Sequence, residues 1–397
     1  MAHQQTADAP PALASTPTPQ ASTADSATVP APATAAVPNA ASAAFPAPAP
    51  ASAAVPAPAS ATVPATDPVH IRTVRIGVLG CSAIAWRRTL PAFRSCPQTR
   101  ITAVASRDPA KAERFATEFD CAATGYEELL ARDDVDAVYL PLPPALHLEW
   151  GAKVLAAGKH LLVEKPIATD AAEARELVHR AKAAGLVLRE NFTFSHHPQH
   201  AEIARLIATG RFGTVRALSG EFCFPPLPDT DIRYVPELGG GALLDAGVYP
   251  IRAAQLLFGD ALEVAGASLR IDPNHKVDVA GQALLVSPQD VLVSVHFGFE
   301  HTYSSTYSLV GSAASLSLDR AFAPPPDFRP VLRIDEQDHS EQITLRPADQ
   351  FGLAVRSFAE AILAGRAASD EAEAPSCAAS VRTLELVDEI RRVAVRR

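Results

Sequence analysis

The feature that most constrains this chain is an alternation of β-rich runs and helical stretches between residues 74 and 189. The β-rich runs are Val74–Leu79, Ile101–Ala105, Ala137–Leu140, His160–Val163 and Leu186–Arg189. The helical stretches follow Gly80, begin at Pro109, and cover Leu146–Ala156 and Ala171–Ala183. Strands that alternate with helices of roughly 10–15 residues form βαβ units, so the pattern predicts an α/β fold with a parallel sheet.

The turn after the first strand carries a dinucleotide-binding pattern. It follows G-x-G-x-x-G/A with Ser82 in place of the middle glycine. In a strand–turn–helix setting this predicts a pyrophosphate at the helix N-terminus, and an ordinary tight turn is the alternative. The predicted cofactor-binding residues here are Gly80, Cys81, Ser82, Ala83, Ile84 and Ala85. The helix N-terminus is also expected to lower the pKa of the Cys81 thiol.

The residues after the second strand bear on the choice between the two nicotinamide cofactors. NAD enzymes place Asp or Glu there, whereas an arginine nearby accommodates the 2′-phosphate of NADP. This chain has Ser106 and Arg107, and both side chains can donate hydrogen bonds to phosphate. The sequence therefore predicts NADP(H), with Arg107 as a solvated loop charge as the alternative.

Two further segments follow predicted strands and so lie at the carboxyl edge of the sheet, where open α/β folds bind ligands. They are the run PLPPALH, residues 141–147, and Glu164-Lys165-Pro166. The proline biases Lys165 towards extended backbone. Lys165 is therefore a candidate to donate to a ribose hydroxyl or a substrate oxygen, or to lower the pKa of a neighbouring phenol.

A third motif is the run GGGALLDAGVYP, residues 239–250. Asp245 and Tyr249 are four residues apart and share one face of a helix. Pro250 predicts that this helix starts near the glycines and bends or restarts around residue 250. Tyr249 can donate a proton in carbonyl reduction if a cation such as Lys165 lowers its pKa from about 10. Taken alone, a helical tyrosine belongs more often to a core or a surface.

Together, these segments resemble the glucose–fructose oxidoreductase / inositol dehydrogenase family, from about Val74 to the C-terminus. Inositol dehydrogenases have histidine where this chain has Tyr249. The runs ENFTFSHHPQH (residues 190–200) and QDHSEQITLRPADQF (residues 337–351) are most similar to the sugar 3-ketoreductases of nucleotide-deoxysugar biosynthesis.

The resemblance implies a Rossmann domain followed by an α+β domain with a large, mostly antiparallel open sheet. It implies catalytic roles for Lys165, Tyr249 and Asp245, and a substrate site of Arg233, Asp245 and Tyr249. For Arg233 a loop salt bridge is an equal alternative. The cofactor residues it adds are Tyr126, Leu142, His147, Glu164 and Lys165.

The activity implied is NADPH-dependent reduction of the C3 ketone of a nucleotide-linked, dTDP-type keto-deoxysugar. One alternative is an NADP-dependent dehydrogenase of xylose, glucose or a trans-dihydrodiol. Another is a non-catalytic NADP-sensing regulator. The expected partners are the nucleotide-linked sugar and, through the open sheet face, further copies of this chain.

Composition divides the chain into three parts. Residues 1–71 hold 14 of the 35 prolines, and the first 70 residues contain no lysine or arginine. This predicts a disordered Ala/Pro-rich arm, with a partner-binding arm as the alternative. Residues 72–193 form the predicted Rossmann domain. Residues 194–397 form the substrate domain, with the option that its C-terminal helix packs back on the Rossmann domain. Its predicted strands are Val215–Phe224, Val264–Ile271, Ala280–Val286, Val291–Phe299 and Tyr303–Val310.

Charge and cysteine usage exclude several classes. A net charge of −9 without a basic run argues against nucleic acid or a membrane surface as the main partner. Five scattered cysteines without a CxxC pair predict neither a disulfide framework nor a zinc site, and indicate a reducing cytoplasm. The HHxxH spacing of His196, His197 and His200 lacks an acidic residue between the histidines and contains Pro198. It therefore predicts the start of a helix and no metal.

Overall fold

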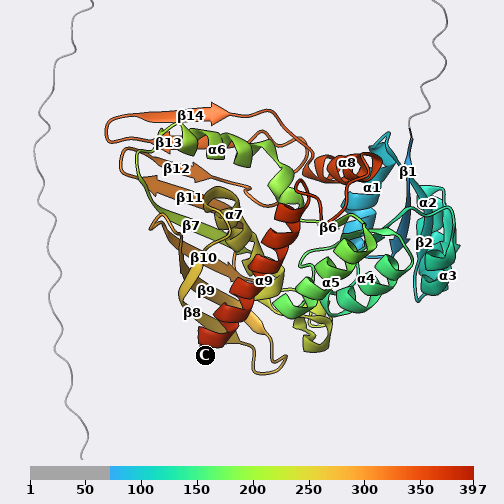
Figure 1. Ribbon diagram of the computed structural model, residues 1–397. Helices are drawn as coiled ribbons and strands as arrows, with labels where there is room; N and C mark the ends of the chain where they lie inside the picture. Colours follow the sequence, from blue (N-terminus) through green and yellow to red (C-terminus); the bar gives the residue numbers. More distant parts are fainter. Residues whose placement is uncertain (1–71) are drawn as a thin grey trace, which may run out of the picture. The chain divides into compact units, whose positions relative to one another are not determined.

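The computed structural model describes residues 72–397, and the predicted disordered arm lies outside the described residues. The first sheet is parallel with strand order β3-β2-β1-β4-β5-β6 (Figure 1). Its strands are β1 (Val74–Leu79), β2 (Thr99–Ala105), β3 (Ala122–Thr124), β4 (Ala137–Leu140), β5 (His160–Val163) and β6 (Leu188–Glu190). The predicted α/β Rossmann architecture is confirmed.

Helices connect these strands, and α2 and α5 begin at side-chain caps. They are α1 (Leu90–Ser95), α2 (Pro109–Phe119), α3 (Tyr126–Ala131), α4 (His147–Ala156) and α5 (Ala171–Ala184). The Asp108 carboxylate accepts hydrogen bonds from the N–H groups of Ala110 and Lys111. Pro109 follows at the first helical position, where its missing N–H costs nothing. Asp170 caps α5 in the same way.

The second sheet has strand order β14-β13-β12-β11-β7-β10-β9-β8-β15, and its neighbours are antiparallel except for β7/β10 and β8/β15. This confirms the mostly antiparallel second sheet. Its strands are β7 (Val215–Cys223), β8 (Glu263–Ile271), β9 (Asp278–Val286), β10 (Leu292–Gly298), β11 (Ser304–Gly311), β12 (Ser315–Leu318), β13 (Val331–Asp335), β14 (Ser340–Thr344) and β15 (Val395–Arg396).

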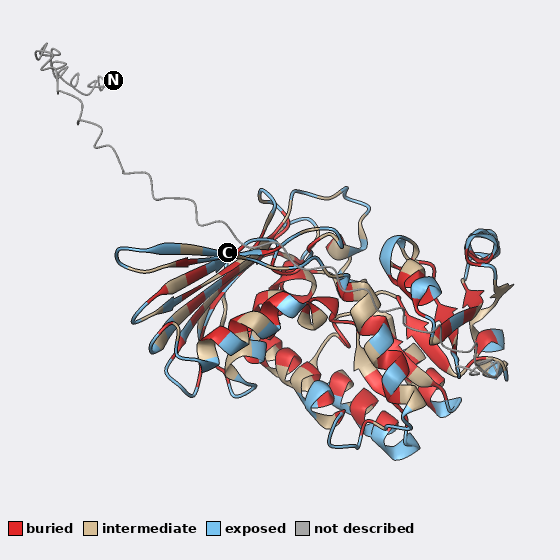
Figure 2. Cartoon of the chain, turned by 90° about the horizontal axis from the view of Figure 1, so that it is seen from above, coloured by how far each residue is buried: buried red, intermediate tan, exposed pale blue. Residues whose placement is uncertain are grey.

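Helices cover one face of this sheet. Buried and exposed residues alternate along its strands (Figure 2), as the period of two in a strand requires. On β10, Val293, Val295 and Phe297 are buried against the helical layer, whereas Leu292 is 63% exposed on the opposite face. Within residues 72–397 no element packs on that opposite face, which leaves it open.

The segment Leu243–Gly247 is a π-helical turn that leads into α7 (Val248–Phe258). Pro250 lies in the first turn of α7, where a proline is tolerated. The prediction of a helix that restarts around residue 250 is confirmed. Helix α7 packs closely on β7. A Cβ at Gly220 would lie 2.7 Å from the Pro250 side chain, so the absence of a side chain at Gly220 allows this close approach.

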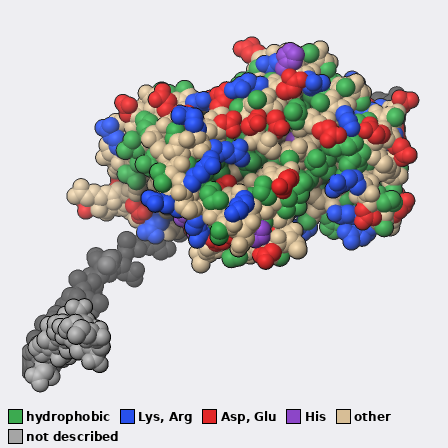
Figure 3. Space-filling view, turned by 90° about the horizontal axis from the view of Figure 1, so that it is seen from below, with side chains coloured by type: hydrophobic (Ala, Val, Ile, Leu, Met, Phe, Trp, Pro, Cys, Tyr) green, Lys and Arg blue, Asp and Glu red, His purple; other side chains and the backbone are tan. Residues whose placement is uncertain are grey.

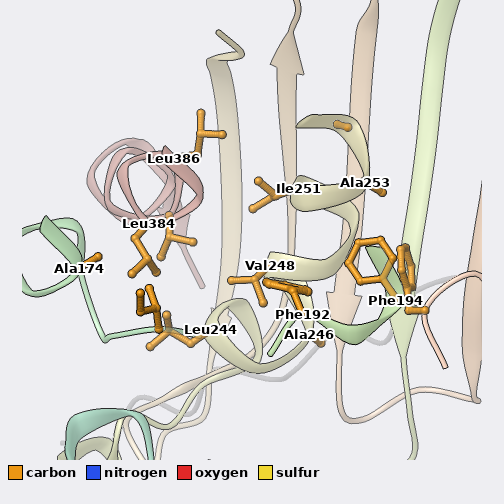
Figure 4. Packing of buried hydrophobic residues seen from close by; sticks show 14 of the residues in the cluster. Ala174, Phe192, Phe194, Leu244, Ala246, Val248, Ile251, Ala253, Leu384 and Leu386 are labelled. Atoms are coloured by element: carbon orange, nitrogen blue, oxygen red, sulfur yellow. The ribbon is translucent and has the colours of Figure 1, made fainter. Parts of the chain in front are cut away.

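The C-terminal helices join the two sheets. Helix α8 (Gln350–Leu363) buries Val355 and Phe358 in the core beside β1. Helix α9 (Ala374–Val393) places Leu384 beside Ala174 of α5 and Leu244 (Figure 4). The C-terminal helices therefore pack back on the Rossmann sheet as well as on the second sheet.

A buried ion pair reinforces this junction. The Arg252 guanidinium of α7 lies 2.5 Å from Glu190 at the end of β6, and the hydroxyl of Ser380 in α9 donates to the same carboxylate. Helix α6 (Pro198–Ala208) packs on the second sheet, where His200 lies 2.9 Å from the Tyr307 hydroxyl of β11.

The surface of the described part is mixed in charge. Acidic and basic side chains are interspersed over the face that Figure 3 shows. None of the helices between residues 72 and 397 is long and apolar enough to cross a membrane.

Candidate active site

The glycine-containing turn after β1 lies at the point where strand order reverses between β1 and β4, the usual ligand crevice of an open α/β sheet. Gly80 has φ of +120°, and a Cβ there would lie 2.7 Å from the Leu142 side chain. Only glycine fits this position. The Ser82 hydroxyl accepts a hydrogen bond from the Ala85 N–H at 3.2 Å, so Ser82 caps the helix that follows.

A cavity of about 600 Å³ opens beside this turn. Its basic residues are Arg87, Lys111 and Arg114, which sequence reasoning missed. Arg114 is held over the Trp86 ring at 5.3 Å. Lys111 and Arg114 are three residues apart on one face of α2, a spacing that could have identified them. Three cations beside a helix N-terminus fit the phosphates of NADP.

The predicted 2′-phosphate residues lie at the end of β2. The Ser106 hydroxyl accepts from the Asp108 N–H at 3.1 Å, and Arg107 lies beside the Tyr126 phenol, whose pKa is raised by burial although Arg107 lowers it. The expectation for Cys81 was wrong. Burial raises the pKa of this thiol to about 11, and outweighs the lowering effect of Lys111.

The side chains of His147 and Glu164 are engaged within the protein. The two ring nitrogens of His147 each lie 2.8 Å from a backbone carbonyl, one of Leu142 and one of Pro166. Glu164 accepts hydrogen bonds from the Tyr139 hydroxyl at 2.6 Å and the Asn191 amide at 2.7 Å. Both therefore fix the loops on either side of Lys165. Cofactor contacts by Leu142, His147 and Glu164 stay predictions.

The structure brings Lys165 together with Asp245 and Arg233, which lie 80 and 68 residues further along the chain in one segment. The Lys165 ammonium donates to the Asp245 carboxylate at 2.9 Å and to its backbone carbonyl at 2.8 Å. Arg233 Nε donates to the other carboxylate oxygen at 2.6 Å. Arg233 also pairs with Asp231 at 3.1 Å, so the predicted loop salt bridge is present.

This network keeps its members charged. Burial acts to raise the pKa of Asp245, but Lys165 and Arg233 outweigh it and hold that pKa well below its ordinary value. Burial acts to lower the pKa of Lys165, but Asp245 and Tyr249 outweigh it, so the pKa is raised. Two cations thus share one central carboxylate, which leaves positive charge available to a developing alkoxide.

Tyr249 lies in a cage of aromatic rings next to Lys165. The Lys165 ammonium is 5.0 Å from the centre of the Tyr249 ring. The ring centroids of Phe192, Phe194, Phe222 and Phe322 lie between 4.7 and 5.7 Å from it. Sequence reasoning missed this cage, whose members come from three separate segments.

The pKa of Tyr249 differs from the expectation. Burial raises it, and Asp245 and Glu164 add to this, so the lowering effects of Lys165 and Arg233 are outweighed. Tyr249 is therefore a protonated phenol at neutral pH. None of the described side chains hydrogen-bonds its hydroxyl, which leaves that group free for a substrate oxygen.

The three histidines of the HHxxH run have separate positions. His196 ends the turn Thr193–His196, and burial lowers its pKa to about 4. His197 Nδ1 accepts from the Gln199 N–H and caps α6, which confirms the predicted helix start. His200 Nδ1 lies 2.9 Å from the Tyr307 hydroxyl in the core, and burial lowers the pKa of His200 to about 3.

Two family models match the chain. The oxidoreductase family with an NAD-binding Rossmann fold matches residues 74–192, and the GFO/IDH/MocA C-terminal domain matches residues 200–317. The chain belongs to the GFO/IDH/MocA family of oxidoreductases. The family predicted from the motifs is confirmed.

Its relatives include enzymes named dTDP-3,4-didehydro-2,6-dideoxy-alpha-D-glucose 3-reductase. The protein of that name from Actinomadura kijaniata is 46% identical over 326 residues, which are 82% of this chain and 97% of the relative. That from Streptomyces violaceoruber is 49% identical over 329 residues, which are 82% and 96% of the two chains. The predicted resemblance to sugar 3-ketoreductases is confirmed.

A crystal structure of a 3-ketoreductase from Actinomadura kijaniata, in complex with NADP and TDP-benzene, superimposes with a TM-score of 0.79. Its sequence is 46% identical, and the match covers 82% of this chain and 99% of that one. An aldose–aldose oxidoreductase from Caulobacter crescentus shares the fold at 22% identity and a TM-score of 0.73, over 81% of this chain and 97% of that one.

Proposed function

We propose that this protein reduces the C3 ketone of a dTDP-linked 3,4-didehydro-2,6-dideoxyglucose with NADPH. The observation that carries the proposal is the Lys165–Asp245 pair beside the Tyr249 ring, at the carboxyl edge of a Rossmann sheet. The 3-reductases that match nearly the full described length support the substrate class.

The described residues fit NADPH. Because Gly80 has no side chain, the backbone of this turn can lie close to a pyrophosphate, and Ser82 caps the adjoining helix. Arg87, Lys111 and Arg114 line the cavity beside this turn and supply cations for the cofactor phosphates, with Lys111 assigned to the 2′-phosphate. Ser106 and Arg107 stand at the end of β2. The cofactor, when bound, supplies the hydride for the ketone carbon.

Tyr249 donates the proton that the reduced oxygen needs, because its phenol is protonated at neutral pH and its hydroxyl is free. Lys165 stabilises the negative charge that develops on that oxygen. Asp245 holds the Lys165 ammonium in place through two hydrogen bonds. The aromatic cage around Tyr249 excludes water, which strengthens these electrostatic interactions.

Arg233 is assigned to the substrate. Its Nε and one terminal nitrogen are used by Asp245 and Asp231. The other terminal nitrogen has no hydrogen-bond partner within residues 72–397, so it is suited to a diphosphate oxygen.

Assembly and location complete the proposal. The open face of the second sheet exposes Leu284, Leu292 and Val310. Apolar side chains on an uncovered sheet favour pairing with another copy of the chain. The five cysteines, all of them among the described residues, are free, which supports the reducing cytoplasm as the compartment.

The experiment is a Tyr249→Phe substitution assayed by NADPH absorbance, with the dTDP-linked 3-keto sugar generated in situ. Losing the proton donor should lower kcat by at least about 100-fold, while the dissociation constant of NADPH stays the same. Structures of the Actinomadura kijaniata ketoreductase include variants with tyrosine replaced by phenylalanine and lysine replaced by alanine or glutamate, all with NADP and TDP-benzene bound.

Free xylose with NADP and NADH with the activated sugar are the comparison assays. Oxidation of xylose without reduction of the activated sugar would contradict the substrate class. Binding of NADPH without turnover of any substrate would contradict catalysis.

A further inference from the structure

A second cluster of chemically reactive side chains lies on the other side of the second sheet. Cys223 from β7, His296 from β10 and His301 from the following loop each place one potential ligand atom within 4.8 Å of the other two. Sequence spacing does not reveal this cluster, because strand pairing assembles it from residues up to 78 positions apart.

Strand register places the cluster on the open face. Phe222 contacts Tyr249 and Phe297 packs beside Gly247, so both point to the helical side of the sheet. Side chains alternate along a strand, so Cys223 and His296 point to the opposite side. The cluster is therefore separated from Lys165 and Tyr249 by the thickness of the sheet.

The position of His301 is built into the fold. Its ring occupies the space above Gly298, where a Cβ would lie 2.4 Å from the imidazole. The His301 N–H donates to the Phe224 carbonyl at 3.2 Å and anchors the loop. Its Nδ1 is buried and has no hydrogen-bond partner within the described part of the chain. A buried imidazole nitrogen without a partner is costly unless something binds it.

Electrostatics at the cluster favour a cation. Glu221 is two residues before Cys223 on the same face, directly opposite His296 in the strand register. Its carboxylate places negative charge beside both Cys223 and His301. The nearest competing cation, Arg270, is ion-paired with Glu300.

We infer that Cys223, His296 and His301 form a site for a divalent zinc-type metal ion. One thiolate and two imidazoles are ligands that Zn²⁺ prefers, and they leave a fourth tetrahedral position for water or the Glu221 carboxylate. Ligand atoms around tetrahedral Zn²⁺ are about 3.5 Å apart, so small side-chain rotations close the site. Binding transfers the Cys223 thiol proton to solvent.

The test uses the full-length protein after treatment with a chelator and gel filtration. Titration with Zn²⁺, followed by elemental analysis, should give one zinc per chain. Titration with Co²⁺ should give the near-ultraviolet thiolate-to-cobalt charge-transfer absorption and the visible bands of tetrahedral cobalt. These spectra use the unaltered protein, so they do not depend on the folding of any variant.

Cys223→Ser and His301→Gln identify the ligands. Each should weaken zinc binding by about 100-fold, and Cys223→Ser should abolish the charge-transfer absorption. The matched control is the pair Cys121→Ser and His339→Gln, residues of the same types outside the cluster, which should bind as the parent does. Absence of saturable binding, or equal affinity in Cys223→Ser and the parent, would overturn the site.

Discussion

The two sheets contribute to the active site in different ways. The parallel sheet supplies residues that directly follow its strands, such as the Gly80 turn after β1 and Lys165 after β5. The second domain supplies Arg233, Asp245 and Tyr249 from one segment between β7 and β8, and aromatic rings from several others. The first contribution is local in sequence, whereas the second is assembled by packing.

This difference has an electrostatic consequence. Residues such as Gly80 and Lys165 lie at the carboxyl edge of the parallel sheet, where their sequence context predicts them. The pKa of Tyr249, in contrast, is set by packing, because burial raises it although the Lys165 ammonium lies 5.0 Å from the ring. Lys165 follows a strand of the parallel sheet and pairs with Asp245 of the second domain. Its replacement therefore has the largest expected effect on activity.

Replacing Lys165 with methionine should remove the ion pair between Lys165 and Asp245. The substitution removes the cation that stabilises the developing alkoxide and leaves Asp245 paired with Arg233 alone. We expect kcat/KM for the activated sugar to fall by about 1,000-fold, measured by NADPH oxidation. Lys182→Met, on the exposed side of α5, is the matched control and should keep the parent rate. A decrease of less than about tenfold would show that the packed segment acts without Lys165.

Asp278 tests how the second sheet holds the catalytic segment. Its carboxylate accepts a hydrogen bond from the Leu243 N–H at 2.6 Å, just before Asp245. Burial raises the pKa of Asp278 to about 6. In the unfolded chain the same carboxyl titrates near about 4. The folded state therefore binds more protons between these values, and stability falls as pH rises through this window.

Asp278→Asn should remove that loss, because an amide does not titrate and its oxygen can still accept from Leu243. The free energy of unfolding of the variant, relative to the parent, should increase by about 3 kcal/mol between about pH 4 and about pH 7. Urea unfolding at several pH values measures it. Asp229→Asn, at an exposed position, serves as control. If the difference in unfolding free energy between variant and parent does not change with pH, Asp278 is already solvated in the folded protein.

Most of the architecture was predictable from the sequence. Strands β1, β4 and β5 have the predicted bounds, because continuous apolar runs between turn residues indicate buried parallel strands. The short strands β3, β12, β13, β14 and β15 were missed, since two to five residues carry little periodicity. Lys165, Asp245 and Tyr249 were found through motifs, and the structure brings them together.

Other parts of the site were not predictable, because they depend on tertiary contacts. Phe222 and Phe322 meet at Tyr249 only after β7 and the loop near residue 322 pack on α7. The pKa of Cys81 was misjudged because the fingerprint predicts a helix N-terminus but not the burial of the thiol. Arg114 was missed although its spacing from Lys111 placed both on one face of α2.

The smallest effect is expected on this face of α2. It tests whether cofactor binding depends on residues that are close together in the sequence. Lys111→Ala should raise KM for NADPH by about tenfold, since one charge-assisted hydrogen bond to phosphate is lost. KM for NADH should not change, because NADH lacks the 2′-phosphate. The ratio of the two constants is therefore the readout, and Lys182→Ala is the control. An equal increase for both cofactors would move Lys111 from the 2′-phosphate to the pyrophosphate, and would mean that Ser106 and Arg107 alone select NADPH.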